Sequence, residues 1–529
     1  MKKFQKFILI LIIVLAFLLR FYKLGTNPPG LYWDEAVFGY DAYSILNTAK
    51  DHHGHFLPLF FESFGDWKLP VYHYLLIPSI KIFGLNEFAV RFPSAFLGTF
   101  TVLIFFFLIK KLTKNTKLSL FCAFFLAISP WHIQFSRGGF ESTVGLFFVV
   151  CGIYLFLLAQ DKKNTLFFLF SFLFFILSMY SYHAYRIFVP LLTLLVLVIY
   201  CEKIKKIFPK LIIPLIIAIL LVLPLILFTF SDNGRSRAIS QSAFKKQDFE
   251  TARVEYDQKS KKPLRFLSKY LYHEPLYYSY ITINGYLDHF SPTFLFLKGD
   301  QIGRHSQVDM GQIYLFESLF LLFSIFALKK INPQTKKLQV AWLLLSPIPA
   351  TIVLPTPHAY RTLQMAPALA FFSGLGAYYI FSKSRLLVFK LLAIAIITYS
   401  FLGYLHLLFI HYPRKFAADW QDGYRQMVAQ IEKYQAYYKR VYITNINQVP
   451  YIYLLFYQKY DPQKFISLHG NKNSFDKYVF ISDDVDIYNK GKILYVAPSW
   501  KKVDGKWLAA ANDSYGRHIY SLWEINGKD

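Results

Sequence analysis

The sequence predicts a mainly α-helical, polytopic membrane protein with about eleven transmembrane helices and a small C-terminal α/β domain. Three observations lead to this prediction. The 529 residues are 55% hydrophobic and 19% aromatic, and the mean hydropathy of +0.33 is too high for a soluble protein of this length. Long apolar runs recur along residues 1–410. From about His411 the charge rises and short β-rich stretches replace these runs.

The first predicted helix covers Phe7–Leu19 and follows the basic segment Met1–Lys6. This start looks like a signal peptide, but Arg20 follows where a small-residue cleavage site would be expected, so we predict an uncleaved helix. Ten further spans are expected at 88–109, 118–129, 143–159, 165–180, 187–200, 211–229, 312–328, 338–354, 362–380 and 386–410. The runs 118–129 and 187–200 are short, so any count from about ten to thirteen fits the sequence.

Alternate connections between these spans are rich in lysine. The chain carries a formal net charge of +26, and much of the excess lies at Lys2, Lys3, Lys6, Lys110, Lys111, Lys114, Lys117, Lys162, Lys163, Lys203, Lys205, Lys206, Lys210, Lys329, Lys330, Lys336, Lys337, Lys383 and Arg385. Basic loops of this kind stay in the cytoplasm. We therefore predict a plasma-membrane protein with a cytoplasmic N-terminus, and the charge calls for no nucleic-acid partner.

The remaining connections must face outward, at 22–87, 129–142, 181–186, 230–311 and 354–361, together with the C-terminal tail. The apolar stretch Leu69–Phe83 is excluded as a span, because counting it would place every later lysine-rich loop outside. We expect it to lie along the outer interface, broken by Pro70 and Pro78. The predicted domains are a transmembrane domain over 1–410 and a soluble extracytoplasmic domain over 411–529.

The C-terminal domain is expected to contain strands at Val441–Thr444, Tyr478–Ser482, Ile493–Val496 and His518–Trp523. Its first helix should start near Asp419 as N-cap and run to about Tyr438. The domain has no phosphate-binding glycine loop, metal-ligand motif or nucleophile elbow in its sequence. We therefore place the chemistry in the outward loops of the first domain.

Two adjacent carboxylates, Asp34 and Glu35, follow the first helix on the outward side. Ordinary solvation of a loop would explain such a pair. Their position just outside the bilayer, among Tyr32, Trp33 and Phe38, favours a second reading in which one carboxylate acts as a general base.

Each short outward loop contains a single arginine, Arg137, Arg186 or Arg361, although outward loops are normally poor in basic residues. Three such cations on one side suggest an anionic ligand, and the planar guanidinium suits phosphate. Contact with lipid headgroups is the alternative. Lys68 adds a fourth candidate cation.

A metal site is left open by the sequence. Asp66, His73, His358 and Glu141 carry metal-binding atoms, but their spacing matches no metal motif. Surface or helix-pairing roles are therefore favoured for them, and no cofactor or metal ligand is predicted with certainty.

A carboxylate base and several phosphate-binding cations at the outer face predict transfer chemistry on a lipid-phosphate substrate. The leaving group would be a polyprenyl phosphate, whose growing charge the cations stabilise as the sugar departs. The base would take the proton from the acceptor hydroxyl.

These residues also resemble a known group, the membrane glycosyltransferases of the C-type fold, which includes protein O-mannosyltransferases and lipid A aminoarabinose transferases. The resemblance covers about residues 1–410 and lies in the order of several motifs: Trp33-Asp34-Glu35-Ala36, Lys68-Leu69-Pro70, Arg91-Phe92-Pro93-Ser94, Ser129-Pro130-Trp131-His132 with Ser136-Arg137, and Pro357-His358 with Arg361. The Lys68 turn departs from the Lys-Pro-Pro of many relatives.

The resemblance implies that Asp34 is the catalytic base and that Glu35 shapes the acceptor site. It also implies that Lys68, Arg137 and Arg361 face the donor phosphate and that Glu141 falls where some relatives keep an acid. The reaction implied is inverting transfer of a hexose or pentose from a polyprenyl-phosphate donor to an envelope glycan, lipid or protein.

Two other functions stay open on the sequence. A transporter or lipid-linked glycan flippase would need ionisable groups near the bilayer midplane, whereas here the charges lie at the rims. An envelope glycan polymerase or ligase would share the chemistry but use a diphosphate-linked donor. Membrane lipids are expected partners in every case.

Overall fold

A computed structural model describes residues 1–235, 242–244, 246–259, 273–383, 386–446, 449–482, 487 and 491–526. Part of the expected outer loop 230–311 and the basic residue Arg385 lie outside this set. The described chain is mainly helical, as predicted, and forms two compact units. Unit 1 comprises Met1–Arg20, Leu97–Ser136 and Glu141–Leu405, and unit 2 comprises Phe21–Phe96, Arg137–Phe140 and His406–Asp529.

Unit 1 consists of helices. They are α1 (Lys3–Phe21), the larger part of α4 (Glu87–Thr113), α5 (Thr116–Ile128), α6 (Pro130–Arg137), α7 (Glu141–Lys162), α8 (Thr165–Met179), α9 (Tyr185–Ile199), α10 (Cys201–Lys205), α11 (Pro209–Phe230), α13 (Lys246–Lys259), α15 (Glu274–Asp288), η1 (Thr293–Leu297), η2 (Gly303–His305), α16 (Glu317–Ala327), η3 (Leu328–Lys330), α17 (Pro333–Leu345), α18 (Ile348–Thr351), α19 (Met365–Lys383) and α20 (Leu387–His406).

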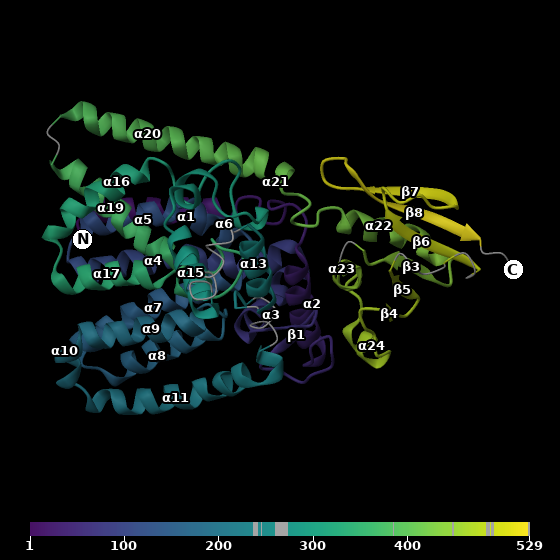
Figure 1. Cartoon of the computed structure of the whole chain (residues 1–529), viewed down its shortest axis with the longest axis horizontal. Coiled ribbons are helices and arrows are strands. Elements are labelled where there is room, and N and C mark those ends of the chain that lie inside the picture. The colour runs from purple at the N-terminus through teal and green to yellow at the C-terminus, as the bar shows by residue number, and fades with distance from the viewer. Residues whose placement is uncertain are drawn as a thin grey trace. The chain divides into compact units, whose positions relative to one another are not determined.

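These helices pack side by side in two groups within unit 1 (Figure 1). Helix α8 contacts α7, α9 and α11, and α19 contacts α5, α16 and α17. Asparagine side chains start two of them: Asn115 accepts a hydrogen bond from the N–H of Leu118, and Asn164 from that of Leu166. Such N-caps satisfy donors that the first helical turn leaves unpaired.

Six described helices are long and apolar enough to cross a membrane: Lys3–Phe21, Glu87–Thr113, Glu141–Lys162, Pro209–Phe230, Met365–Lys383 and Leu387–Lys415. The bent pair Thr116–Ile128 and Pro130–Arg137 would make a seventh. Two expected spans form shorter apolar helices, Thr165–Met179 and Tyr185–Ile199. The chain is thus of multi-pass type, while the count of eleven and the orientation stay predictions.

The first part of unit 2 follows the first helix of the chain. It contains α2 (Trp33–Thr48), the hairpin β1 (Phe61–Ser63) and β2 (Asp66–Lys68), and α3 (Pro70–Phe83). Helix α3 starts at Pro70 and continues through Pro78, so the expected break at Pro78 is wrong. Pro70 occupies the first turn, where its missing N–H costs nothing.

The second part of unit 2 is an α/β domain, as predicted. Its elements are η4 (Leu407–His411), α21 (Tyr412–Lys415), α22 (Tyr424–Tyr434), η5 (Gln435–Tyr437), β3 (Val441–Thr444), α23 (Pro450–Tyr457), α24 (Pro462–Ser467), β4 (Ser474–Phe475), β5 (Tyr478–Ile481), β6 (Lys492–Pro498), β7 (Lys506–Asn512) and β8 (His518–Asn526). The six strands have the order β4-β5-β3-β6-β8-β7, with β3 parallel to both β5 and β6 (Figure 1).

The helix expected at Asp419 begins five residues later. Gln421 and Gly423 have φ values of 56° and 114°, so the chain turns there and α22 starts at Tyr424. The carboxylate of Asp422 accepts hydrogen bonds from the N–H and the hydroxyl of Ser514 instead of capping the helix. Helix α2 packs against both α3 and α23, so the two parts of unit 2 share one core. The predicted domain boundary at residue 411 stays a prediction.

Candidate functional site

Asp34 lies in the first turn of α2 and forms an ion pair with Lys68. The Asp34 Oδ1 and Lys68 Nζ atoms are 3.1 Å apart, and Asp66 Oδ2 lies 3.5 Å from the same ammonium group. The Lys68 side chain is 7% exposed, whereas Asp34 is 28% and Asp66 26% exposed. A buried ammonium group therefore joins two carboxylates that solvent or a substrate can reach.

The hairpin β1–β2 places Lys68 and Asp66. Ser63 pairs with Asp66 and Phe61 pairs with Lys68 across the two strands. The turn between them contains Phe64 and Gly65 with φ values of 55° and 81°. Because α3 begins two residues after Lys68, the lysine is fixed between a strand end and a helix start.

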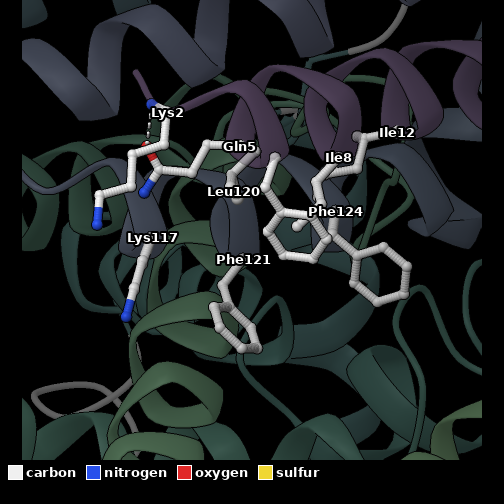
Figure 2. A pocket seen from close by; sticks show the side chains of 9 residues that line it. Lys2, Gln5, Ile8, Ile12, Lys117, Leu120, Phe121 and Phe124 are labelled. Carbon is white, nitrogen blue, oxygen red and sulfur yellow. Dashed lines mark hydrogen bonds between the residues drawn. The ribbon is translucent and has the colours of Figure 1, made fainter.

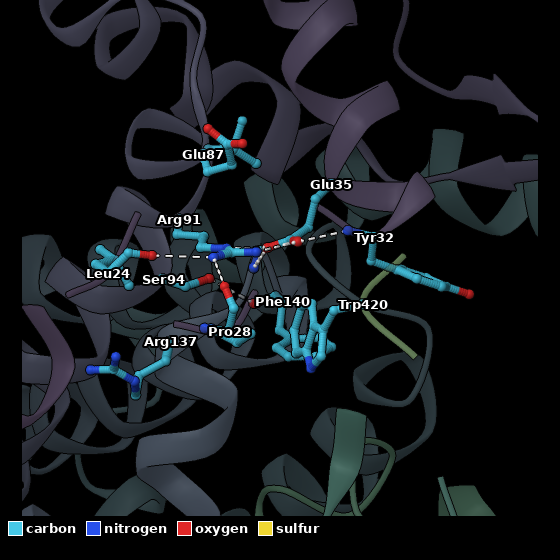
Figure 3. Close-up of polar contacts among 12 residues, drawn as sticks. Leu24, Pro28, Tyr32, Glu35, Glu87, Arg91, Ser94, Arg137, Phe140 and Trp420 are labelled. Carbon is cyan, nitrogen blue, oxygen red and sulfur yellow. Dashed lines mark hydrogen bonds and ion pairs between the residues drawn. The ribbon is translucent and has the colours of Figure 1, made fainter. Parts of the chain in front are cut away.

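Glu35, the neighbour of Asp34, is buried and pairs with Arg91 of α4. Arg91 Nε lies 2.9 Å from Glu35 Oε1, and its Nη2 lies 3.1 Å from Oε2 (Figure 3). The N–H groups of Tyr32 and Gly139 donate to the same carboxylate at 3.1 and 2.7 Å. The Glu35 carboxylate thus ties the start of α2 to two other segments of unit 2.

Arg91 also holds the segment before α2. Its guanidinium donates to the carbonyl oxygens of Leu24, Pro28 and Gly30 and lies 5.4 Å from the ring of Trp420. The side chain is fully buried. The path of the chain into the first turn of α2 is therefore set by one arginine.

Consecutive residues of a helix point about 100° apart. That rotation separates the two acidic neighbours: Glu35 turns into the unit and Asp34 stays partly exposed. Glu35 is placed to hold Asp34 in position, while its predicted part in the acceptor site stays a prediction.

Arg137 belongs to unit 2 but not to this ion pair. Its Nη2 donates to the carbonyl oxygens of Tyr22 and Asn27 at 2.9 and 2.8 Å, and its guanidinium lies 5.1 Å from the ring of Phe409. Figure 3 shows its guanidinium directed away from Glu35. The predicted contact of Arg137 with a donor phosphate stays a prediction.

The other candidate residues lie in unit 1. The hydroxyl of Tyr360 donates to Glu141 at the start of α7. Arg361 is 9% exposed and donates to the carbonyl of Leu354. Tyr360 was not singled out in the sequence, although its loop was. Glu141, Tyr360 and Arg361 therefore occupy one region of unit 1.

Arg186 has a different neighbour within unit 1. Its Nη1 lies 3.1 Å from the hydroxyl of Thr229, near the end of α11. The structure thus links Arg186 to α11, whereas Arg361 and Glu141 are linked through the 356–362 segment. The predicted role of Arg186 stays a prediction.

A buried cluster of Asp300, His305 and His358 lies beside Arg361. The potential ligand atoms of the three residues all lie within 4.8 Å of one another. Burial opposes ionisation of Asp300, but His305 and the N–H groups of Ile302 and Ala359 keep the pKa of this carboxyl below its usual value. Burial, assisted by Arg361, lowers the pKa of His305. Of the four residues with metal-binding atoms named from the sequence, only His358 belongs to this cluster.

His289 contacts the backbone of the cluster at His358. Its Nε2 accepts a hydrogen bond of 3.0 Å from the N–H of His358, and its Nδ1 lies 2.6 Å from the carbonyl of Gly285. Burial, with a contribution from Arg361, lowers the pKa of His289 to about 4. A neutral ring with its proton on Nδ1 satisfies both contacts.

A second buried acid–imidazole group lies in unit 2, on α2. Asp41 Oδ1 and His52 Nδ1 are 2.5 Å apart, and His73 Nε2 lies 3.7 Å from Asp41 Oδ2. Burial opposes both charges, yet the mutual attraction lowers the pKa of Asp41 and raises that of His52. Burial dominates at His73 and lowers its pKa to about 4. These contacts tie the 51–55 turn to α2.

Unit 1 also has an apolar groove of about 460 Å³ between α1 and α5 (Figure 2). It is lined by Ile8, Ile12, Phe121 and Phe124, with Lys2 and Lys117 also on its wall. None of its lining residues is a carboxylate. The groove therefore offers room for an apolar chain but no general base.

The comparisons with known proteins agree with this architecture. The family model of dolichyl-phosphate-mannose-protein mannosyltransferases matches residues 10–231. An uncharacterized protein of Aquifex aeolicus (strain VF5) is 30% identical over 167 residues, which cover 31% of this chain and 32% of that protein. The chain thus spans about a third of the length of this relative.

Two solved structures resemble the chain more broadly. ArnT from Cupriavidus metallidurans, bound to undecaprenyl phosphate, superposes with a TM-score of 0.57 and 11% identity, covering 97% of both chains. The archaeal oligosaccharyltransferase AglB from Archaeoglobus fulgidus, in complex with an inhibitory peptide and a dolichol-phosphate, gives a TM-score of 0.52 and 12% identity. That match covers 86% of this chain and 63% of AglB.

These likenesses confirm, at the level of the fold, the resemblance that the motifs indicated. The family model covers the segment that carries Asp34, Lys68, Arg91 and Arg137, and the ArnT likeness extends over nearly the whole chain. This protein has the C-type fold of membrane glycosyltransferases.

Proposed function

We propose that this chain is an inverting glycosyltransferase that moves a sugar from a polyprenyl-phosphate donor to a cell-envelope glycan, lipid or protein. The observation that carries the proposal is the group of Asp34, Lys68 and Asp66, in which a reachable carboxylate is held by a buried ammonium group. The lipid phosphates bound by ArnT and AglB support the choice of donor.

In the proposed reaction, Asp34 takes the proton of the acceptor hydroxyl while that oxygen attacks the anomeric carbon. The bond from this carbon to the phosphate oxygen breaks on the opposite face, and polyprenyl phosphate leaves with one more negative charge. Lys68 Nζ forms ion pairs with Asp34 and Asp66, and because an ammonium group has three N–H donors, it can also donate to a phosphate oxygen. Arg361 is proposed to contribute further positive charge.

Replacing Asp34 by Asn tests the base. Removal of a general base lowers rates by about 10²- to 10⁴-fold, so the variant should lose transfer while binding donor as before. The exposed Glu432 of α22 offers a matched control, Glu432→Gln. Wild-type turnover by the Asp34 variant would show that the base is another group.

The donor class is tested with a panel of lipid-linked sugars on purified protein. Transfer from polyprenyl-phosphate sugars is expected, and transfer from polyprenyl-diphosphate sugars alone would assign a polymerase or ligase instead. Movement of a lipid-linked sugar across vesicles without transfer would assign a flippase. Arg361→Ala should raise the KM for donor, and unchanged donor kinetics would remove this arginine from the site.

The proposed location of the site is the outer membrane face. Exposed Cys201 adjoins a basic loop, so a membrane-impermeant thiol reagent should leave it unlabelled in intact cells. A Lys506→Cys variant, made in a Cys201→Ser background, should be labelled because Lys506 is exposed on β7. The reverse labelling pattern would place the C-terminal domain in the cytoplasm.

A further inference from the structure

We infer that unit 1 has a binding site for a phosphate-bearing anion, in a pocket that Lys111, Lys114, Lys203 and Lys330 line together with Gln160. The pocket has a volume of about 520 Å³. It lies where α4, α7 and α9 end and where α17 begins. The inference is independent of the proposed transfer reaction, because no catalytic step has been assigned to any residue that lines this pocket.

The lysines that line the pocket come from separate segments of the chain. Lys111 and Lys114 lie at the end of α4, Lys203 lies in α10, and Lys330 is the last residue of η3. Asp161 is the single carboxylate among the described residues of the lining, and it pairs with Lys111. Four ammonium groups against one carboxylate leave the wall with a formal charge of +3. Such a wall attracts anions and repels cations.

The orientation of membrane helices does not by itself explain this grouping. Basic residues that keep a loop in the cytoplasm need only lie in that loop. Lys162, Lys205 and Lys206 are exposed in the same predicted loops, and they are not among the described residues that line the pocket. Lysines gathered around one cavity repel one another unless an anion balances their charge. The grouping therefore points to a bound anion.

Gln160, near the end of α7, is an independent sign of a ligand. The residue is 7% exposed, and within the described part of the chain its Nε2 atom has no hydrogen-bond partner. A buried amide group without a partner destabilises a fold, so such groups are rare unless something binds them. Because Gln160 lines the pocket, rotation of its terminal amide lets it donate to an anion held by the lysines.

Contacts between the helix ends hold the wall of the pocket in place. The side-chain amide of Asn332 and the hydroxyl of Thr335 both donate to the carbonyl of Leu112, at 2.8 and 2.9 Å, so the start of α17 is tied to the end of α4. Lys111 donates to Asp161 and thereby ties α4 to α7. The site is thus formed before a ligand binds, which reduces the entropy that binding costs.

The charge and the position of the pocket favour phosphate. Lysine is a common phosphate ligand, and its N–H groups form strong hydrogen bonds with phosphate oxygens. Helices α4 and α7 are long and apolar enough to cross a membrane, so a pocket at their ends lies at the level of lipid headgroups. Basic pockets between membrane helices bind phospholipid headgroups with several negative charges. A soluble diphosphate has the same chemistry, and the experiment separates these two sources.

The test measures binding to the full-length protein purified in a neutral detergent. We expect cardiolipin, a phospholipid with two phosphate groups, to raise the melting temperature of the wild type, whereas phosphatidylcholine, which has no net charge, should not. Pyrophosphate is the soluble probe, and a shift with pyrophosphate alone would support the same site with a soluble ligand. Lys114→Gln, Lys203→Gln and Lys330→Gln, combined in one variant, should raise the Kd for the bound probe by on the order of 100-fold, because each lysine beside an anionic surface contributes about fivefold.

A matched triple variant controls for net charge. Lys162→Gln, Lys205→Gln and Lys206→Gln together remove the same charge from exposed positions of the neighbouring loops. This variant should bind the probe almost as the wild type does, because salt screens charges that lie outside the pocket. Equal Kd values for the two triple variants would overturn the inference, as would a wild type that neither cardiolipin nor pyrophosphate stabilises.

Gln160→Leu separates binding from folding. The change removes a buried donor that has no partner among the described residues, so the ligand-free variant should melt no lower than the wild type. A hydrogen bond to a charged group is lost only when the anion is bound, and we therefore expect the Kd for the probe to rise about tenfold. A variant that melts lower but binds the probe as the wild type does would assign Gln160 to the fold and overturn its part in the site.

Discussion

The acidic groups of the two units differ in the exposure of the carboxylate and in the partner that it contacts. In unit 2, Asp34 is partly exposed and pairs with a lysine, while its neighbour Glu35 is buried and pairs with Arg91. In unit 1, Asp300 is itself buried and faces two imidazoles. A reachable carboxylate on a rigid support can exchange a proton with a substrate, whereas the enclosed Asp300 accepts the N–H groups of Ile302 and Ala359 and so holds two backbone segments together. The exposure and the partners of each carboxylate therefore indicate whether it can react with a substrate or only stabilises the structure.

The largest effect is expected when the support of Asp34 is removed. Arg91→Met removes the cation that pairs with the buried Glu35 and leaves three carbonyl groups without this donor, and breaking a buried ion pair costs about 3–5 kcal/mol. We expect a strongly lowered melting temperature and loss of transfer. Glu35→Gln should cost less, because Arg91 keeps its carbonyl contacts. Stable, active Arg91→Met protein would refute the supporting role of this ion pair.

A smaller loss of stability, together with a loss of activity, is expected for Lys68→Met. The side chain is 7% exposed, and losing one charge-stabilising donor typically lowers kcat by about 10²- to 10³-fold. The melting temperature should change less than for Arg91→Met. Lys50→Met, at an exposed position of the same unit, is the control. Equal kinetics for the two lysine variants would mean that Lys68 only shapes the hairpin.

In unit 1, a change that likewise removes the partner of a carboxylate is Tyr360→Phe, because the Tyr360 hydroxyl donates a hydrogen bond to Glu141. A hydrogen bond to a charged group contributes about 1.5–3 kcal/mol, so we expect a moderate drop in thermal stability. Tyr437→Phe alters an exposed tyrosine (75% exposed) and should change nothing. If the two variants melt alike, the Glu141–Tyr360 contact does not hold the loop.

The smallest effect is a pH dependence from Asp41 and His52. His52 has a raised pKa in the fold, so its contribution is present below its unfolded value, near pH 6.5, and is lost as the pH rises through the raised value. Asp41 has a lowered pKa, so its share is lost as the pH falls through that value. His52→Gln should therefore destabilise the protein at about pH 6 more than at about pH 9, measured by melting temperature. A constant difference would contradict the ion pair.

Much of the fold could be predicted from composition and local patterns. Long apolar runs indicate membrane helices, and alternating β-rich stretches predicted four strands of the C-terminal sheet. Helix α2 was missed because residues 35–42 are buried on all sides, so the segment shows no apolar stripe. Without that helix, the opposite directions of Asp34 and Glu35 could not be predicted.

The candidate site residues Asp34, Glu35 and Lys68 were named from the sequence and stay predictions, whereas the buried groups that hold them in place were not predicted. Asp34 and Lys68 stand out because charges beside membrane helices are unusual. Arg91 lies at the head of an apolar run, 56 residues from Glu35, and no local pattern links them. Asp300 and His305 lie in a long loop whose pairing with His358 depends on tertiary packing.

Gly30 packs closely against the backbone of the C-terminal domain, and this contact limits where the chain can be cut into fragments that fold. A Cβ atom at Gly30, where φ is 64°, would lie 2.5 Å from the carbonyl oxygen of Trp420. The N–H of Trp33 also donates to Gln421. A fragment that ends near residue 410 would leave the entrance of α2 without these partners. Chimeras with relatives should therefore exchange residues 21–96 and the C-terminal domain as one cassette.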